Sequence, residues 1–474
     1  MPASSSSRRP GQNRRPSGPR RGGRAPLDPA RLVAFEVLKA VRVDNAYANL
    51  VLPHLLREHG LEGRDAAFAT ELASGTLRQQ GTYDAVLAAC LDRPLAKVEA
   101  KVLDALRLGT HQLLSTRVPD HAAISTTVDL VKAKVGVGAG SFANAVLRRV
   151  ARQPLADWVA QVAPPVASDP HGHHAVAQSH PRWVVDALAA AVDEAELGAL
   201  LAADNAPPRV VLVARPGRIT REELVAQTGG EPTALSPYGV VLGGGSPGSV
   251  PAVADGLAGV QDEGSQLVAL ALAAAPLDGP DERWLDLCAG PGGKSALLAA
   301  LAAERGAQLV ANEAQPHRAG LVRANLRGAE GTAGVVAGDG TRPPFRPGAF
   351  DRVLVDAPCT GLGALRRRPE ARWRRRPDDL ATLVPLQEAL VRSALALVRP
   401  GGVVLYSTCS PVLAETRDVV AAVTADAGEV VDVSGLLPGL ADAEGPAPGT
   451  LQLWPHRHAT DAMFMAVLRP REAR

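Results

Sequence analysis

The segment at residues 283–295, RWLDLCAGPGGKS, restricts the fold of this chain more than any other stretch. It begins with an apolar run around Asp286, which predicts a short buried strand, and it continues through a glycine-rich turn at residues 290–293. From Ser295 onward the pattern SALLAALAAERG predicts a helix. Glycines let a ligand approach the backbone, and a helix N-terminus offers free N–H groups. A strand, a glycine turn and a helix in this order therefore predict a site for a nucleotide-like ligand.

The glycine turn by itself leaves the class of ligand open. Its last residues, Gly293-Lys294-Ser295, match the end of a phosphate-binding loop of the Walker A type. The first glycine of that loop would fall on Cys288, which disfavours a phosphate site. A dinucleotide fingerprint, G-x-G-x-x-G, would need a glycine where Ser295 stands. The choice of ligand therefore depends on the segments that follow.

Polar side chains follow each of the next strand-like segments of the chain. Four apolar runs between residues 308 and 405 have strand character and are spaced as in an α/β domain. In open parallel sheets, ligands bind beyond the carboxyl ends of the strands. We therefore expect the glycine turn to converge with the side chains that come after these strands, which are Glu313, Asp339, Asp356, Cys359 and Cys409.

The motifs CAGPGGK, DAPCTG and STCS occur in this chain in that order. This combination resembles the Sun family of RNA cytosine-C5 methyltransferases, and the resemblance covers roughly residues 180–470. It implies a Rossmann-like class I fold that uses S-adenosylmethionine as the methyl donor. The family usually has alanine where this chain has Gly290, and aspartate where it has Glu313.

The resemblance implies that the cofactor lies along the glycine turn and the acidic side chains. Glu313 is expected to hold the ribose hydroxyls, an acidic role that its spacing from the glycines also favours. Asp339 is expected at the adenine end, and Asp356 between the methionine part and the cytosine. For each carboxylate alone, capping of a helix N-terminus is the alternative. The predicted cofactor site comprises Cys288, Ala289, Gly290, Pro291, Gly292, Gly293, Lys294, Glu313, Asp339 and Asp356.

Cys359 and Cys409 are the candidate catalytic cysteines. Carbon 5 of cytosine is too weak a nucleophile to take a methyl group directly, so a thiolate first adds to carbon 6. DNA cytosine methyltransferases use the cysteine of a Pro-Cys pair, here Cys359, whereas the resembled RNA family uses that of a Thr-Cys pair, here Cys409. We expect Cys409 to be the nucleophile and Cys359 to act in product release. A buried small hydrophobe is the usual fate of a free cysteine, but two in one crevice favour catalysis.

Two further residues are expected to assist the cysteines. Asp356 can hydrogen-bond the edge of the cytosine, and Lys294 can orient or polarise the base. Lys294 is the only lysine after Lys134, in a chain whose positive charge is mostly arginine. Arginine would suffice for a surface charge, so this position is expected to need a compact ammonium group.

Composition excludes several classes of protein. Four cysteines in 474 residues cannot form a disulfide framework, and no C-x-x-C spacing indicates a metal site. No apolar run reaches the ~20 residues of a membrane span, and no secretory signal is visible. These observations predict a cytoplasmic protein without a membrane or metal partner, and the resemblance implies that its partner is RNA rather than DNA. The sequence does not predict an oligomeric state.

Residues 1–27 are predicted to be a disordered arginine-rich arm. The first 24 residues hold seven of the 51 basic residues and no acidic one, which leaves 44 basic and 49 acidic groups in the rest. Such a segment has almost nothing to bury. It can attract RNA phosphates electrostatically, and a solubilising tail without further function is the alternative.

Residues 28–152 are predicted to form an all-helical bundle. Asp28-Pro29 is an N-cap followed by proline at the first helical position. The segment RLGTHQLLSTRVPDHAAISTTVDLVK and the following FANAVLRRV resemble the antitermination factor NusB, which implies an RNA-contacting domain. Turn signals such as Gly81 and residues 136–140 separate the later helices, which are expected at residues 45–59, 65–79, 82–91, 97–115, 120–134 and 141–152.

The remainder is divided into three further parts. Residues 153–180, with several prolines and histidines, are predicted to be a solvated linker, and metal binding by the histidines is the less favoured alternative. Residues 181–260 are expected to form a small α/β module of the RNA-recognition type. Residues 261–474 are the predicted methyltransferase domain. Within it, the arginine run at residues 364–376 is expected to grip phosphate and base.

Together these observations predict an enzyme that makes 5-methylcytosine in RNA through a covalent cysteine adduct. The NusB-like segment favours 16S ribosomal RNA as the substrate. The alternatives are methylation of transfer RNA or DNA, and a non-catalytic RNA-binding factor of ribosome assembly. A P-loop nucleoside triphosphatase is disfavoured, because Cys288 stands where the first glycine of the loop would be.

Overall fold

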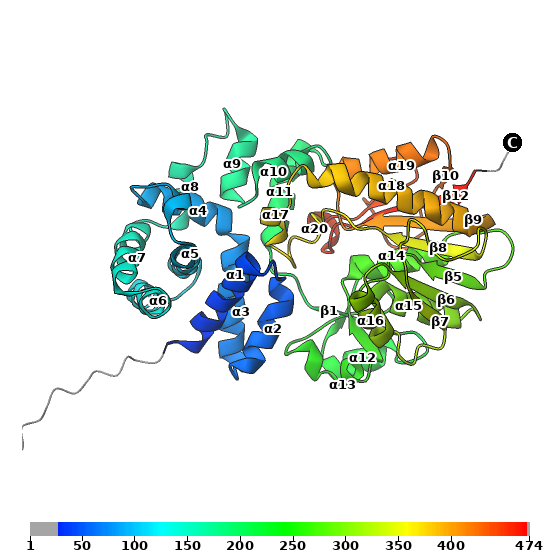
Figure 1. The fold of residues 1–474 in the computed structure, drawn as a ribbon, viewed down its shortest axis with the longest axis horizontal. Coiled ribbons are helices and arrows are strands. Elements are labelled where there is room, and N and C mark those ends of the chain that lie inside the picture. The colour runs from blue at the N-terminus through cyan, green and yellow to red at the C-terminus, as the bar shows by residue number, and fades with distance from the viewer. Residues whose placement is uncertain (1–26, 472–474) are drawn as a thin grey trace, which may run out of the picture.

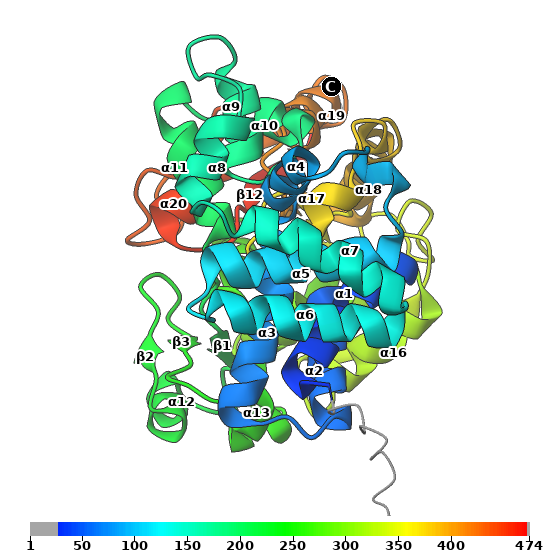
Figure 2. The same ribbon diagram turned by 90° about the vertical axis from the view of Figure 1, so that its left-hand side faces the viewer.

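The computed structural model describes residues 27–471 of the chain. It contains a helical bundle, a small four-stranded sheet and a large sheet covered by helices on both faces (Figure 1). The predicted arginine-rich arm lies outside the described residues, except for its last position. Figure 2 views the molecule from the side of the helical bundle, with the small sheet beside it.

The N-terminal part is the expected helical bundle. Its first helix begins as predicted, because Asp28 accepts a hydrogen bond from the Arg31 amide and Pro29 occupies the first turn. Fully buried side chains from separate helices form its core, among them Val33, Leu72 and Leu147. Its elements are α1 (Pro29–Val43), α2 (Ala48–Glu58), α3 (Gly63–Arg78), α4 (Gln80–Cys90), η1 (Leu95–Lys97), α5 (Ala100–Ser115), α6 (Asp120–Lys134) and α7 (Val137–Val150).

Two of the expected turns in this bundle lie inside helices. Gly81 belongs to the first turn of α4, and most of residues 136–140 form the start of α7. Glycine lowers helix propensity but does not forbid a helix whose other faces are buried. Tertiary packing rather than local propensity therefore determines that both segments are helical.

The segment 153–180 is helical, so the prediction of a solvated linker is wrong. It contains α8 (Leu155–Val162) and α9 (Pro170–Ala177). Pro170 stands at the first helical position, where its missing N–H is not needed, and Asp169 caps the helix through the Gly172 amide. The prolines that suggested a loop are thus signals for the start of helices.

The histidines of this segment have structural partners. His171 Nδ1 lies 2.7 Å from Asp186 Oδ1, and the ring of His180 is buried. Burial lowers the pKa of His180 well below its ordinary value, so this ring is neutral. The described part of the chain contains no group of three or more His, Cys, Asp or Glu side chains that could hold a metal ion.

The region 181–260 consists of two separate parts rather than one module. Helices α10 (Arg182–Ala189) and α11 (Glu194–Asn205) share a buried cluster with Leu362 and Trp454 of the large domain. The other part is an antiparallel sheet of order β2-β3-β1-β4 with its own core. This sheet comprises β1 (Val211–Ala214), β2 (Glu231–Pro232), β3 (Gly239–Val241) and β4 (Ala258–Val260), with α12 (Arg221–Thr228), η2 (Pro247–Ser249) and α13 (Pro251–Ala254).

The large sheet has the Rossmann-like arrangement that the sequence predicts. Its strand order is β10-β12-β9-β8-β5-β6-β7, and β11 pairs with β12. The five strands from β9 to β7 are parallel, and β12 and β10 are antiparallel additions. The strands are β5 (Arg283–Asp286), β6 (Gln308–Glu313), β7 (Thr332–Ala337), β8 (Phe350–Asp356), β9 (Val398–Thr408), β10 (Gly428–Val431), β11 (Leu451–Gln452) and β12 (Phe464–Pro470).

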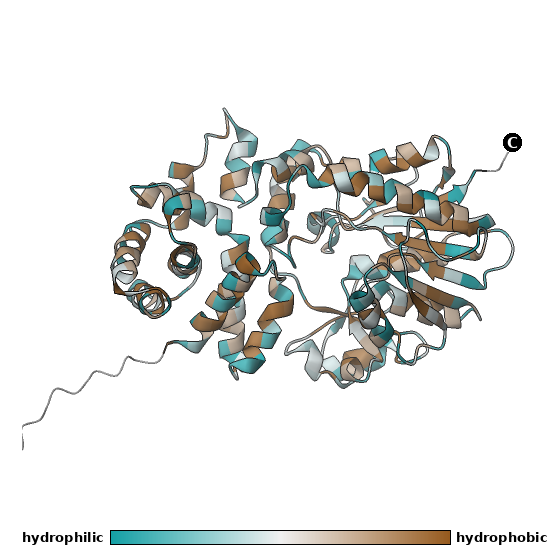
Figure 3. Ribbon diagram, in the orientation of Figure 1, coloured by the Kyte–Doolittle hydropathy of each residue, from teal (hydrophilic) through white to brown (hydrophobic). Residues whose placement is uncertain are grey.

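Helices cover both faces of this sheet, and apolar residues gather on the strands between them (Figure 3). One face packs against α14 (Glu263–Ala274) and α15 (Gly293–Ala303), and the other against α18 (Asp379–Leu397) and α19 (Arg417–Thr424). By length and composition α18 is apolar enough to cross a membrane. It instead lies along the sheet as a core helix. The remaining elements are α16 (Pro316–Asn325), α17 (Ala371–Arg374), η3 (Leu413–Glu415) and α20 (Pro455–His458).

Candidate active site

The glycine turn and the end of β6 meet at the carboxyl edge of the sheet. The Gly290 amide donates a 3.0 Å hydrogen bond to Glu313 Oε2, and Arg318 Nη2 donates to the Gly290 carbonyl at 2.6 Å. Gly292, with φ of 110°, adopts a left-handed conformation at the start of α15 that favours glycine. The predicted juxtaposition of the turn with Glu313 is therefore present in the structure.

Gly290 and Glu313 are matched in size. A Cβ atom at Gly290 would lie 2.1 Å from Glu313 Oε2, inside contact distance. The longer glutamate thus occupies the room that a methyl group at position 290 would need. In this chain, Glu313 therefore requires glycine at position 290.

Asp339 lies just beyond β7, next to β6 in the sheet, but part of its carboxylate is already engaged. Its Oδ1 accepts hydrogen bonds from the Thr341 amide at 2.9 Å and the Thr341 hydroxyl at 2.8 Å. These bonds lower the pKa of Asp339 and close the turn. The alternative of local capping applies to this residue, while its second oxygen is exposed and open to a ligand.

Lys294 and Asp356 form an ion pair between the glycine turn and β8. Lys294 Nζ lies 2.8 Å from Asp356 Oδ2 and 3.4 Å from the Ser265 hydroxyl at the start of α14. Burial alone would lower the pKa of Lys294, but the Asp356 carboxylate outweighs it and raises the pKa. The ammonium group is thus charged and held close to Cys409, one of the two candidate cysteines.

The two candidate cysteines are in contact. β8 and β9 are parallel neighbours with Asp356 opposite Ser407, so the residues that follow the strands come together. Cys359 Sγ lies 3.5 Å from Cys409 Sγ. Cys288, by contrast, follows β5 among apolar side chains, and burial raises the pKa of its thiol well above the ordinary value.

The surroundings of the two cysteines differ in charge. A hydrogen bond from the Cys359 thiol lowers the pKa of Cys409 against the effect of burial, and the positive charges of Lys294 and Arg368 act in the same direction. The same contact, together with burial and the Glu415 carboxylate, raises the pKa of Cys359. The charges around the pair thus favour ionisation of Cys409 over ionisation of Cys359.

Two buried polar groups near the turn were not selected from the sequence. Asp286 accepts a 2.6 Å hydrogen bond from the Ser295 hydroxyl, but its Oδ1 has no partner among the described residues. Both amide atoms of Gln261, close to Gly293, are likewise buried without a partner there. A carboxylate inside an apolar strand is a signal in the sequence that singles out Asp286. No comparable signal singles out Gln261.

Asp286 should make stability depend on pH. Burial raises the pKa of its carboxyl to about 7 from an ordinary 3.8, with Asp356 contributing. The contribution of Asp286 to the free energy of unfolding is fully present below pH 3.8, and it is lost as pH rises through about 7. The stability gained by Asp286→Asn over the native chain should therefore grow with pH across this window, by at most ~1.4 kcal/mol per pH unit. Urea unfolding of both proteins at several pH values checks this, and a constant difference would contradict it.

The prediction that the arginine run 364–376 grips RNA is wrong for most of the run. Only Arg368 and Arg376 are exposed. The other five arginine side chains donate hydrogen bonds to protein groups: Arg366, Arg367, Arg372, Arg374 and Arg375.

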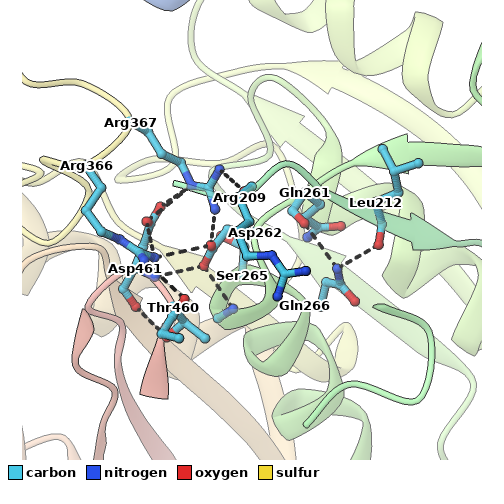
Figure 4. A network of polar contacts seen from close by, with 12 residues as sticks. Arg209, Leu212, Gln261, Asp262, Ser265, Gln266, Arg366, Arg367, Thr460 and Asp461 are labelled. Carbon is cyan, nitrogen blue, oxygen red and sulfur yellow. Dashed lines mark hydrogen bonds and ion pairs between the residues drawn. The ribbon is translucent and has the colours of Figure 1, made fainter. Parts of the chain in front are cut away.

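Arg366 and Arg367 belong to an ion network that joins three segments (Figure 4). Asp461 lies 3.2 Å from Arg366 Nη2 and 3.0 Å from Arg367 Nε, and Arg367 also contacts Asp262. Asp262 in turn caps α14 through the Gly264 amide. The network therefore ties the arginine run to the exit of the small sheet and to the C-terminal segment.

Arg372 and Trp373 connect α17 to the N-terminal half of the chain. Arg372 is fully buried and donates to the carbonyl of Ser179 at 3.0 Å and to Asn205 Oδ1 at 2.8 Å. The Trp373 ring packs against Gly81 of α4. The run is thus a structural joint between the helical bundle and the large domain.

The C-terminal histidines have protein partners. His456 Nε2 lies 2.7 Å from Glu196 Oε2 of α11. His458 accepts a hydrogen bond from the Trp454 amide through Nδ1, and its Nε2 lies 2.9 Å from the Ala441 carbonyl. Both rings hold α20 in place away from the cysteines.

A glycine turn, acidic side chains and two cysteines meet at the carboxyl edge of the parallel sheet. This arrangement defines a Rossmann-like methyltransferase domain, which follows a NusB-like bundle in the chain. A family model described as 16S rRNA methyltransferase RsmB/F matches residues 272–469, and a NusB family model matches residues 28–152. The ribosomal RNA small subunit methyltransferase B of Pseudomonas putida is 35% identical over 83% of this chain and 88% of its own length. The chain belongs to the 16S rRNA methyltransferase RsmB/F family and is therefore an rRNA methyltransferase.

Other known proteins agree with this assignment. The protein MT1451 of Mycobacterium tuberculosis, named provisionally as a methyltransferase, is 53% identical over 96% of this chain and 99% of its own length. The crystal structure of PH0851 shares the fold, with a TM-score of 0.77 at 21% identity over 94% of this chain and 99% of that one. The structure of NSun6 from Pyrococcus horikoshii with SFG has a TM-score of 0.54 at 17% identity, and it covers 62% of this chain and 99% of its own.

Proposed function

We propose that this enzyme transfers a methyl group from S-adenosylmethionine to carbon 5 of a cytosine in 16S ribosomal RNA. The contact between Cys359 and Cys409, with opposite displacements of their pKa values, is the observation that carries the proposal. A single thiolate would suffice to attack a pyrimidine. A second, protonated sulfur beside it supports a reaction with a separate release step.

The reaction follows from the chemistry of the base. The Cys409 thiolate adds to carbon 6 of the cytosine, and the ring electrons move to carbon 5, which becomes nucleophilic. S-adenosylmethionine supplies an electrophilic methyl group, which carbon 5 takes as the bond from methyl to sulfonium sulfur breaks and S-adenosylhomocysteine leaves. A base then removes the proton from carbon 5, and the carbon–sulfur bond breaks to return the Cys409 thiolate. The target base must leave the stack for carbon 6 to be attacked.

Lys294 and Asp356 are assigned to orient the base. Their 2.8 Å ion pair stands beside Cys409, and the positive charge of Lys294 lowers the pKa of that thiol. An ammonium group can polarise the cytosine carbonyl oxygen, while a carboxylate can accept from its exocyclic amine. The ion pair of Lys294 and Asp356 thus supports both ionisation of Cys409 and positioning of the cytosine ring.

Cys359 is assigned to product release. Its strand end is held from the other side by Glu415, which accepts a hydrogen bond from the Thr360 amide at 2.8 Å. Because Cys359 is not used for the initial attack, it can later lose its proton to solvent and, as a thiolate, accept the proton from carbon 5 while Cys409 leaves as the thiolate. This division of labour matches the predicted roles of the two sulfurs.

The residues at the glycine turn fit S-adenosylmethionine. Glu313 holds a buried carboxylate beside the glycine turn, and each of its oxygens accepts one backbone hydrogen bond, which leaves a lone pair on each for a ribose diol. The partnerless Oδ1 of Asp286 provides a further buried acceptor for the ligand. The neighbour NSun6, crystallised with SFG, supports a small-molecule site in this fold.

Glu313→Ala should weaken binding of S-adenosylmethionine by ~1.5–3 kcal/mol, because the ribose hydroxyls lose a charged acceptor. Glu313→Asp should retain most of the affinity, since it keeps the carboxylate. Calorimetry measures both variants against the native protein, which should bind no ATP–Mg. An unchanged affinity in Glu313→Ala would place the ribose elsewhere, and ATP binding without S-adenosylmethionine binding would overturn the cofactor assignment.

The reaction is expected to take place on RNA in the cytoplasm. RNA is the expected macromolecular partner, because the chain combines an rRNA methyltransferase domain with a NusB-like bundle. An enzyme that modifies bacterial ribosomal RNA acts in the cytoplasm. The expected dependence on thiol chemistry suits that reducing compartment.

A further inference from the structure

Tyr47, in the loop between α1 and α2, lies among arginines of the catalytic domain. The Cζ atom of Arg368 is 4.9 Å from the centre of its ring, and that of Arg374 is 5.3 Å away. Such distances are typical of cation–π contacts. Tyr47 as a residue is 39% exposed. An aromatic side chain of the helical bundle is thus joined to the segment that follows Cys359.

Polar contacts on both sides of Tyr47 fix its position. Arg374 donates to the carbonyl of Asn45 at 2.9 Å and to that of Val41 at 3.3 Å, at the C-terminal end of α1. Glu370 accepts from the Ala48 amide at 3.2 Å, at the N-terminal end of α2. A cation on the free carbonyls and an anion on the free amide complement the two helix ends. The loop is therefore clamped to α17 rather than merely touching it.

The same clamp leads directly to the catalytic cysteines. Arg375, next to Arg374, donates to the carbonyls of Thr360 at 3.0 Å and Cys359 at 3.3 Å. Arg368 is exposed, and its guanidinium forms no hydrogen bond or ion pair with any residue between 27 and 471. Its positive charge contributes to lowering the pKa of Cys409.

Exposed apolar side chains lie at the two helix ends that flank this loop, in the last residue of α1 and in the first turn of α2. Val43 is 56% exposed and Leu50 is 67% exposed. Exposed aliphatic groups, an exposed aromatic ring and an unpaired guanidinium together are suited to an unpaired nucleotide, which offers a flat base and a phosphate. A protein partner would be favoured by a wider apolar patch, whereas this one is bordered by arginines.

We propose that Tyr47 and Arg368 form a subsite for the nucleotide next to the target cytosine, with the base stacked on Tyr47 and its phosphate bound by Arg368. The inference rests on the proposed function, because it assumes a single-stranded RNA segment at Cys409. It gives the helical bundle a direct part in substrate binding. The fusion of the bundle to the catalytic domain then completes one RNA site.

The test measures methylation of protein-free, unmodified small-subunit ribosomal RNA by the full-length enzyme. Tyr47→Ala should raise KM for the RNA roughly 10- to 100-fold, as expected for loss of one base stack, with little change in kcat. Tyr47→Phe should behave like the native enzyme because it keeps the ring. Arg368→Ala should raise KM and weaken its dependence on salt, whereas Arg376→Ala, an exposed arginine of the same run, should do neither.

The outcomes separate the subsite from the proposed function. Native KM in Tyr47→Ala would overturn the subsite, and so would a loss in Tyr47→Phe equal to that in Tyr47→Ala. Variants that bind RNA normally but lose a ribosomal protein would show a protein-docking surface instead, which also overturns it. If the native enzyme methylates no cytosine, the proposed function fails. RNA affinity by fluorescence anisotropy still tests the stack in that case, because it needs no turnover.

Discussion

Cys409→Ala should abolish methyl transfer and any covalent RNA adduct, whereas Cys359→Ala should accumulate as a covalent protein–RNA complex. Without the Cys409 thiolate, nothing attacks carbon 6, and removal of a catalytic nucleophile lowers turnover by roughly 10⁴-fold or more. Without Cys359, the attack still takes place but release fails. Denaturing gels of each variant with RNA and S-adenosylmethionine show the adduct as a shifted band.

The converse pattern would reassign the roles. An adduct trapped in Cys409→Ala would make Cys359 the nucleophile, as in the DNA enzymes. Activity in both variants without an adduct would contradict covalent catalysis. Cys90→Ala is the matched control, because this buried thiol lies in the core of the helical bundle and outside the candidate active site.

Arg372→Met should lower the free energy of unfolding by ~3–5 kcal/mol. The native guanidinium is fully buried, and its loss leaves the Ser179 carbonyl and the Asn205 amide oxygen without their donor. Burial already lowers the pKa of Arg372 to about 10, which shows the cost of placing a charge there. Urea unfolding followed by tryptophan fluorescence measures the change.

Arg376→Ala is the control for this substitution. Arg376 is exposed, so its replacement should change stability by less than ~0.5 kcal/mol. If Arg372→Met kept native stability but lost RNA affinity, the arginine run would be an RNA grip after all. The joint between the bundle and the large domain would then need another explanation.

The sequence is informative where one rule of topology governs many residues. Parallel strands end at the same edge of a sheet, so the order of strands and polar residues is enough to place Glu313, Asp356 and the two cysteines together. The contact of Gly290 with Glu313 and the pairing of Lys294 with Asp356 occur at that edge. Neither contact can be derived from spacing alone.

The sequence is misleading where the partner of a residue is remote in the chain. Arg372 finds its acceptors in Ser179 and Asn205, which lie 193 and 167 positions away. Nothing local distinguishes such an arginine from a solvated one. Pro170 is similarly ambiguous, because a proline that ends a helix and one that begins it have the same composition signal.

The helical bundle and the catalytic domain are connected through the arginine run rather than through a flexible linker. α8 and α9 order the segment between them, and α17 contacts both parts (Figure 1). RNA bound to the bundle would therefore meet the catalytic edge at a fixed distance. Tyr47 lies at this junction.

The identity of the methylated nucleoside is the most direct test of the proposal that this enzyme makes 5-methylcytosine in 16S ribosomal RNA. Purified enzyme is incubated with S-adenosylmethionine carrying an isotope-labelled methyl group and unmodified small-subunit ribosomal RNA, and the nucleosides are separated after digestion. If the enzyme has the proposed function, the label will appear in 5-methylcytidine and at one position of the RNA. Label in another nucleoside, or transfer to transfer RNA or DNA but not to small-subunit ribosomal RNA, would contradict it.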